Sequence, residues 1–323
     1  MKKSFLFILI AGICAGFLES TAATARIADM SRADCQRHIA RIVCLVDPID
    51  KILSRSDLLT RPCLPEGRTY VKEMQDIYRL FPEPVNRMMC GLNRIFVEKK
   101  FWASGYAHRR TNSIGIQQQL LEEKQSLSAW LTWKERLSFQ LPNIENTDIR
   151  LPTIRAEAPG AAGRATYYIV AHELAHLIDL SNGISDIRKG DFSRLSWTVR
   201  RRYLRSQTLP SNWERPCFYL CRGNKIKAAR APRVYQALRK SAYVSLYATR
   251  NPSEDFADTL TIFLLTQLPG FRYELSLGDQ VISRMNSFWQ PQQLREKLTY
   301  IDLLLKRPYV FLSSHGPPIL PVN

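Results

Sequence analysis

The sequence predicts an α+β fold that is predominantly helical, with a small sheet packed against one central helix. Three observations predict it. Long segments carry apolar residues at helical spacing, as at residues 31–46, 167–180 and 252–265. Short segments rich in β-branched and aromatic residues, at 94–98 and 113–117, are typical of strands. A hydrophobic content of 45% and a charged content of 23% are those of a globular chain with a sizeable core.

Residues 1–25 have the features of a signal peptide. Lys2 and Lys3 precede an apolar run over residues 5–17, which is too short for a comfortable transmembrane helix. Ala23-Thr24-Ala25 then supplies a cleavage site of small residues. We therefore expect an exported protein, periplasmic or secreted, whose mature chain begins at Arg26 and has no transmembrane span. An uncleaved anchor is the alternative.

Six cysteines remain after that cleavage, and an even number in an exported chain favours disulfides. They are Cys35, Cys44, Cys63, Cys90, Cys217 and Cys221. A helix over residues 31–46 would separate Cys35 from Cys44 by about 13 Å, whereas a disulfide needs Cα atoms within about 7 Å. We therefore expect these two to pair with Cys63 and Cys90, in either combination. Cys217 and Cys221 are close enough to pair with each other, and zinc binding by that pair is an alternative.

Residues 26–92 are expected to form a helical region stapled by disulfides. Ser31-Arg32-Ala33-Asp34 resembles a capping box at the start of the first helix. That helix is expected to continue to Asp47-Pro48, where proline stops it. A second helix is expected over residues 70–80, and a short third one ends at Cys90-Gly91.

Residues 93–323 are expected to form one α+β domain. The two strands named above come first, and His108 lies between them, where a lone histidine is more often a surface residue than a ligand. Residues 127–139 are ambiguous between helix and strand. An edge strand is expected at residues 149–154, ahead of the central helix.

The charge balance favours anionic partners. Lys and Arg number 46 against 29 Asp and Glu, which gives a net charge of +17. Such a field attracts nucleic acid, lipid headgroups or acidic envelope polymers. The basic stretch between residues 200 and 240 is expected to be a solvated face. No zinc finger or aromatic stacking signature accompanies the charge, so no specific nucleic-acid partner is expected.

The segment His172-Glu173-Leu174-Ala175-His176 is the most informative one. On a helix, residues four apart share a face, so both imidazoles can reach one ion. Glu173 is rotated off that axis and can contact a water on the metal without being a ligand. This is the H-E-x-x-H arrangement of zinc metallopeptidases, with the glutamate as general base. Gly183 is placed for a left-handed cap at the end of this helix.

A catalytic zinc site takes three protein ligands and leaves a fourth position open. Glu254 is our candidate for the third ligand, near the start of a helix in which Pro252 occupies the first turn. Asp258 can accept the free N–H of a ligating imidazole, and Asp179 can do the same or anchor the central helix. The alternative for Glu254, Asp255 and Asp258 is that they only place favourable negative charge at the N-terminus of their helix. His315 lies among Gly and Pro residues, a poor rigid platform.

Two helices carrying H-E-x-x-H and E-x-x-x-D resemble the gluzincins, the thermolysin-like class of zinc metallopeptidases. Residues 247–258 are similar, more particularly, to the anthrax lethal-factor-like metallopeptidase family, in which a tyrosine precedes the glutamate ligand by seven residues. The resemblance covers two short patches. Asp258 stands where that family has a glutamate, and the separation between His176 and Glu254 is longer than expected. The resemblance implies a zincin-like core and a role for Tyr247 as donor to the developing oxyanion.

The expected function is that of an exported zinc metallopeptidase acting on peptide or amide bonds of a protein, a peptide or cell-envelope material. Zn²⁺ would polarise the scissile carbonyl, and Glu173 would move the proton from water to the leaving amine. Arg250 is the alternative to Tyr247 as oxyanion donor. The alternative function is an envelope-associated binding protein for anionic polymers with a structural zinc site, although such sites normally have four protein ligands.

Overall fold

The computed structural model describes residues 30–47, 60–140, 150–200, 203–213, 216–219, 225–284 and 291–306. The expected signal peptide, Cys221 and His315 lie outside these residues. Within them, no helix is both long enough and apolar enough to cross a membrane.

The helices are more extensive than the strands, as the sequence predicts. The α-helices are α2 (Arg32–Ile42), α4 (Val71–Leu80), α5 (Glu83–Cys90), α6 (Gln118–Glu122), α7 (Leu127–Arg136), α8 (Ala165–Asn182), α9 (Asp191–Arg194), α10 (Ala231–Arg239), α11 (Pro252–Thr266) and α13 (Gln292–Lys306). The 3-10 helices are η1 (Pro65–Tyr70), η2 (Arg109–Thr111), η3 (Gly160–Gly163), η4 (Ala228–Arg230) and η5 (Tyr247–Arg250).

The strands of the described residues form four small sheets. They are β1 (Val43–Val46), β2 (Arg94–Glu98), β3 (Gly105–His108), β4 (Ser113–Gln117), β5 (Phe139–Gln140), β6 (Pro152–Glu157), β7 (Trp197–Arg200), β8 (Tyr203–Ser206), β9 (Ile226–Lys227), β10 (Arg272–Leu277) and β11 (Gln280–Arg284). One sheet has the order β1-β2-β4-β3, in which only β3 is antiparallel to its neighbour. The other sheets are β11-β10-β6, β5-β9 and β7-β8.

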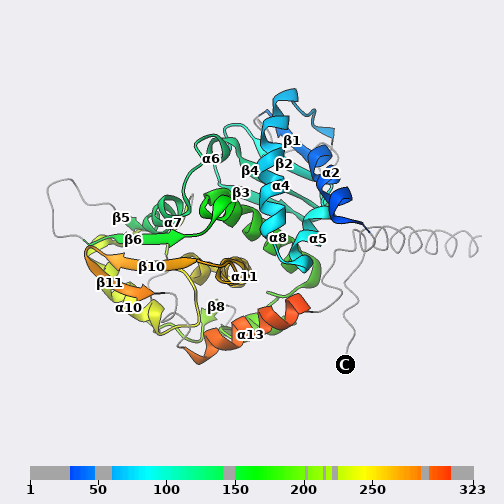
Figure 1. The fold of residues 1–323 in the computed structure, drawn as a ribbon. Helices are drawn as coiled ribbons and strands as arrows, with labels where there is room; N and C mark the ends of the chain where they lie inside the picture. Colours follow the sequence, from blue (N-terminus) through cyan, green and yellow to red (C-terminus); the bar gives the residue numbers. More distant parts are fainter. Residues whose placement is uncertain are drawn as a thin grey trace, which may run out of the picture.

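Helix α8 is the element around which the rest is arranged. It packs against β3 and β4 of the four-stranded sheet and against α11, while α7 packs on β6 of the three-stranded sheet (Figure 1). Its residues from Ala165 to Asp179 are buried except for His176. A helix that is apolar on nearly every side lies inside a core rather than on its surface, which explains the long apolar run in its sequence.

The expected first helix ends earlier than predicted. It stops at Ile42, and Val43 to Val46 form β1, which pairs in parallel with β2. All four of these residues are buried, and a short continuous apolar run suits a buried parallel strand as well as a helix. The prediction of helix up to Val46 was therefore wrong, and the expected N-terminal region shares a sheet with the residues that follow it. The predicted cap is confirmed, because the Ser31 hydroxyl accepts from the backbone N–H of Asp34 at 3.1 Å.

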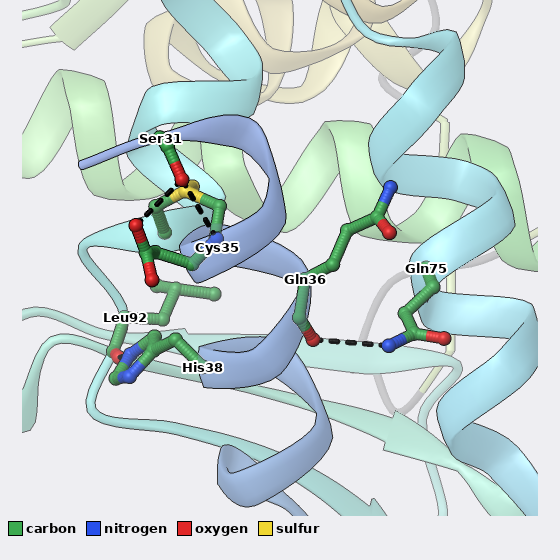
Figure 2. The surroundings of a disulfide bond; sticks show 8 residues. Ser31, Cys35, Gln36, His38, Gln75 and Leu92 are labelled. Atoms are coloured by element: carbon green, nitrogen blue, oxygen red, sulfur yellow. Dashed lines mark hydrogen bonds between the residues drawn. A yellow bond between two sulfur atoms is a disulfide. The ribbon is translucent and has the colours of Figure 1, made fainter.

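Two disulfides connect the N-terminal elements, as expected. Cys35 pairs with Cys90 and Cys44 with Cys63, at Cα separations of 5.3 and 4.9 Å. Figure 2 shows the first pair beside α2, where Gln75 of α4 donates to the carbonyl of Gln36 at 3.0 Å. Cys35 and Cys44 therefore pair with Cys63 and Cys90, as predicted. Cys217 also takes part in a disulfide.

Several other predicted elements are found with small shifts. The strands at residues 94–98 and 113–117 are β2 and β4, and the ambiguous segment is α7 followed by β5. The predicted edge strand is β6, which lies at one edge of its sheet. Strand β3 was not predicted. It places His108 at a strand end, with Nδ1 2.7 Å from the Thr111 hydroxyl.

Candidate metal centre

The two helices that carry the candidate ligands are fixed at their ends by local interactions. Helix α8 ends at Gly183, whose φ of 64° lies in the left-handed region, and whose N–H donates to the Asp179 carbonyl at 2.7 Å. Helix α11 begins after Asn251, whose side-chain oxygen accepts from the N–H of Glu254 at 3.0 Å. This cap places Glu254 in the first turn of α11, where that helix faces α8.

The structure brings the three predicted ligands together. The Nε2 atoms of His172 and His176 lie 3.1 Å apart, and Oε2 of Glu254 lies 3.2 and 3.3 Å from them. A tetrahedral zinc ion with bonds of about 2.0–2.1 Å separates neighbouring ligand atoms by about 3.3–3.4 Å. The three donor atoms therefore have the spacing of one face of a zinc tetrahedron. Two imidazoles and a carboxylate are also a donor set that suits zinc. Within the described part of the chain, no other His, Cys, Asp or Glu side chains converge in this way.

The remaining ring nitrogens contact the two aspartates singled out in the sequence. Nδ1 of His172 lies 3.0 Å from Oδ1 of Asp258, at contact distance but without the alignment of a hydrogen bond. Nδ1 of His176 lies 3.2 Å from the hydroxyl of Ser253, which donates to Asp179 at 2.7 Å. Asp179 thus reaches its histidine through Ser253, a residue that the sequence did not single out. Asp179 also accepts from the backbone N–H and the hydroxyl of Ser185, both at 2.6 Å, which anchors the end of α8.

Asp258 is fully buried and has several further donors. The hydroxyl of Tyr168 donates to it at 2.8 Å and the ammonium of Lys134 at 3.0 Å, and the hydroxyl of Ser245 also donates to it. Lys134 comes from α7, in the segment that the sequence left ambiguous. No local pattern could indicate its role, since its partner lies more than a hundred residues away along the chain.

The charges in the centre favour a cation. Burial lowers the pKa of His172, but its contacts with Asp258 and Glu254 outweigh burial and raise the pKa to about 9. Burial raises the pKa of Glu254, but the two histidines hold it well below its usual range. Lys134 and His172 likewise overcome burial and keep the pKa of Asp258 low. A metal ion would displace the proton from His172, because ligating imidazoles are neutral.

Glu173 lies in the centre without being one of the three converging ligands. It is buried, and this burial raises the pKa of its carboxyl group. Strand β3 passes close to it: a Cβ on Gly105 would lie 2.9 Å from Oε1 of Glu173 and 2.7 Å from Cγ2 of Ile169. Glycine at position 105 therefore allows the edge strand to approach the carboxylate.

Tyr247 and Arg250, the two candidate oxyanion donors, both reach the centre. The Tyr247 hydroxyl donates to Oε1 of Glu254 at 3.0 Å, and Nη1 of Arg250 lies 3.0 Å from that hydroxyl. The ring of Tyr247 meets the ring of Phe218 edge-on, with 4.8 Å between the ring centres. The ammonium of Lys134 lies 4.0 Å from the centre of the Tyr247 ring. Both the hydroxyl and the ring of Tyr247 therefore have neighbours in the centre.

A cavity of about 400 Å³ opens onto the donor atoms. Strand β3, the edge strand of its sheet, forms one wall of the cavity. Trp102 and Leu180, two large apolar side chains, contribute to the lining with exposed fractions of 68% and 42%. The lining residues are Trp102, Ala103, Ser104, Gly105, Tyr106, Ala107, Trp130, Lys134, His172, Glu173, His176, Leu180, Tyr219, Tyr247, Arg250 and Glu254. Of these, the sequence singled out the ligands, Glu173, Tyr247 and Arg250 as site residues, but not the Trp102 loop or Tyr219.

Comparison with known proteins found no match: no family model, no curated protein and no solved structure corresponds to this chain. The geometry of the described residues therefore carries the argument about function.

Proposed function

We propose that this chain is a zinc metallopeptidase of the gluzincin type, with a zincin-like core similar to that of the lethal-factor-like family. The observation that carries the proposal is the spacing of 3.1 to 3.3 Å among the donor atoms of His172, His176 and Glu254. A second carboxylate, Glu173, lies beside them in the same cavity. The three protein ligands would leave a fourth position for chemistry, whereas a structural site is normally closed by four.

Each residue of the centre has a defined task in peptide hydrolysis. When bound, zinc supplies a Lewis acid that polarises the scissile carbonyl and lowers the pKa of water. Glu173 takes the proton from the attacking water and delivers it to the leaving amine. Tyr247 donates to the developing oxyanion, for which its hydroxyl exchanges Glu254 for the substrate oxygen, and Arg250 adds positive charge beside it.

The cavity fits an extended peptide. Among the described strands, β3 pairs with β4 alone, so its other edge offers backbone N–H and C=O groups to a substrate strand. Trp102 and Leu180 add exposed apolar surface to the same cavity. We therefore propose a protein or peptide substrate that places an apolar side chain against them.

We also propose that the protein is exported. Two described disulfides, Cys35–Cys90 and Cys44–Cys63, are typical of oxidising compartments. The expected signal peptide supports the same conclusion from the sequence.

A direct experiment loads the purified mature chain with zinc and incubates it with a peptide library and with cell-wall fragments. We expect one zinc per chain and cleavage that a chelator abolishes. His176→Ala is the matched control, because His176 is the one ligand of α8 that is not fully buried, so its removal should leave the core folded. Undiminished zinc in this variant, measured by elemental analysis, would refute the ligand assignment.

The second candidate function is an envelope-associated binding protein for anionic polymers. It is favoured by the exposed basic side chains of Lys225, Lys227 and Arg233 around the start of α10, in a chain of net charge +17. In that case zinc would be structural, and replacing Glu173 would change neither polymer binding nor zinc content. Binding of an anionic polymer without any cleavage of the library would favour this function.

A further inference from the structure

Lys134 is a buried cation in the wall of the cavity. Its side chain is only 4% exposed, yet it lines the space in front of the donor atoms. Burying an ammonium group is costly unless it is paired, and an apolar side chain of similar size would fill the same space without that cost. The charge of Lys134 therefore calls for an explanation beyond packing.

Two contacts connect this ammonium to the metal centre. Its Nζ atom lies 3.0 Å from Oδ1 of Asp258, the same oxygen that lies 3.0 Å from Nδ1 of His172. The ammonium and the imidazole thus share one carboxylate oxygen. Nζ also lies 4.0 Å from the ring centre of Tyr247, whose hydroxyl donates to Glu254.

We propose that Lys134 is a positioning residue of the metal centre, which acts through Asp258 and Tyr247. The inference rests on the proposed function, since it concerns how the centre holds zinc and uses it. It predicts two effects of opposite sign. The positive charge of Lys134 repels a zinc ion in the centre and so weakens zinc binding. Its contact with the ring of Tyr247 keeps that phenol in place, which favours turnover.

The chain contains a matched control in Lys297 of α13. Its ammonium is fully buried and donates to both carboxylate oxygens of Asp255, at 2.7 and 2.6 Å. It also lies 4.4 Å from the ring centre of Tyr243. Both lysines therefore pair with an aspartate of α11 and contact a tyrosine ring. Lys297, however, does not line the cavity of the metal centre.

Replacement by methionine is comparable at the two positions. Asp258 keeps donors from Tyr168 and Ser245 when Lys134 is replaced. Asp255 keeps donors from Ser196 and Trp197 when Lys297 is replaced. Each substitution thus removes one buried ammonium and leaves its carboxylate hydrogen-bonded.

The experiment compares Lys134→Met with Lys297→Met in the full mature chain. Zinc affinity is measured by competition with a chromogenic chelator, and kcat and KM with the best peptide from the library. We expect Lys134→Met to hold zinc about tenfold more tightly, because a positive charge has gone. Its kcat should fall about tenfold or more while KM stays within about twofold, because the lost contact acts on Tyr247. Lys297→Met should leave all three values within about twofold of the wild type, whatever it does to the melting temperature.

A Lys134→Met chain that holds zinc no more tightly than the Lys297→Met chain would overturn the inference, and so would an unchanged kcat. If either methionine variant does not fold, Lys134→Gln and Lys297→Gln keep a donor for the aspartate and remove the charge, and the same outcomes decide. The zinc measurement uses no substrate. A wild-type chain that binds zinc and cleaves nothing would therefore contradict the proposed function, while the zinc comparison still decides the role of Lys134.

Discussion

Helix α11 carries two buried aspartates three residues apart, and comparing them shows what distinguishes a functional site from a core. Asp255 and Asp258 are both fully buried, and each accepts from a buried lysine and from a hydroxyl group. Asp255 faces Trp197 and Lys297, which belong to the core. Asp258 faces His172 and Lys134, which line the cavity of the metal centre. The two aspartate–lysine pairs are alike in burial and in hydrogen bonding. Their roles therefore differ because of the residues beside each pair.

The core side of this comparison should show its effect in stability alone. Asp255→Asn leaves the ammonium of Lys297 buried opposite a neutral amide, which should cost about 3–5 kcal/mol in the free energy of unfolding. Denaturant titration measures this cost, and elemental analysis should find an unchanged zinc content. Loss of zinc from a chain that is still folded would mean that Asp255 also supports the metal centre, which would contradict its assignment to the core.

The centre side should show its effect in turnover. Tyr247→Phe removes one hydroxyl and keeps the contacts of the ring with Phe218 and Lys134, so the fold and the zinc content should survive. If the hydroxyl donates to the oxyanion, kcat should fall about a hundred- to a thousandfold, which corresponds to about 3 kcal/mol of transition-state stabilisation. KM should change little, because this interaction forms mainly in the transition state. An unchanged kcat would shift the role to Arg250.

A smaller effect should appear in the pH dependence of stability, and it comes from Glu135, the neighbour of Lys134 in α7. Burial raises the pKa of Glu135 from 4.5 to about 7, against the opposing contacts with Tyr235, Lys134 and the Leu246 N–H. Between these pH values the folded chain binds more protons at Glu135 than the unfolded chain does. The free energy of unfolding should therefore fall as the pH rises through this window.

Glu135→Gln tests that dependence, because its amide does not titrate and can still accept from the Leu246 N–H. We expect a flatter profile of unfolding free energy between pH 4.5 and about 7, measured by denaturant titration at each pH. A profile as steep as that of the wild type would assign the dependence to another group.

The sequence was most informative where chemistry depends on local spacing. His172 and His176 share a face because they are four residues apart on one helix, and Glu254 follows Pro252, which marks the first turn of its helix. The contact between α8 and α11 has no local signal. It could be expected only because zinc needs a third ligand beside the two histidines. The separation along a helix excluded a disulfide between Cys35 and Cys44. The fold was needed to show which of them pairs with Cys63 and which with Cys90.

The sequence was least informative where contacts join distant segments. Lys134 meets Asp258 across the fold, and nothing in its local pattern separates it from a solvated lysine. Residues 43–46 were mistaken for helix because four buried apolar residues suit both structures. Strand β3 was missed because it is short and starts at Gly105, a residue that β-propensity disfavours but that the carboxylate of Glu173 requires to be small.

The central claim is that Glu173 is the base of a zinc peptidase, and one variant tests it most directly. Glu173→Gln keeps the shape of the side chain and all three ligands but cannot take a proton from water. The account predicts that this variant still binds one zinc per chain and loses turnover by several orders of magnitude on the same peptide. A zinc-loaded Glu173→Gln chain with wild-type turnover would contradict the account.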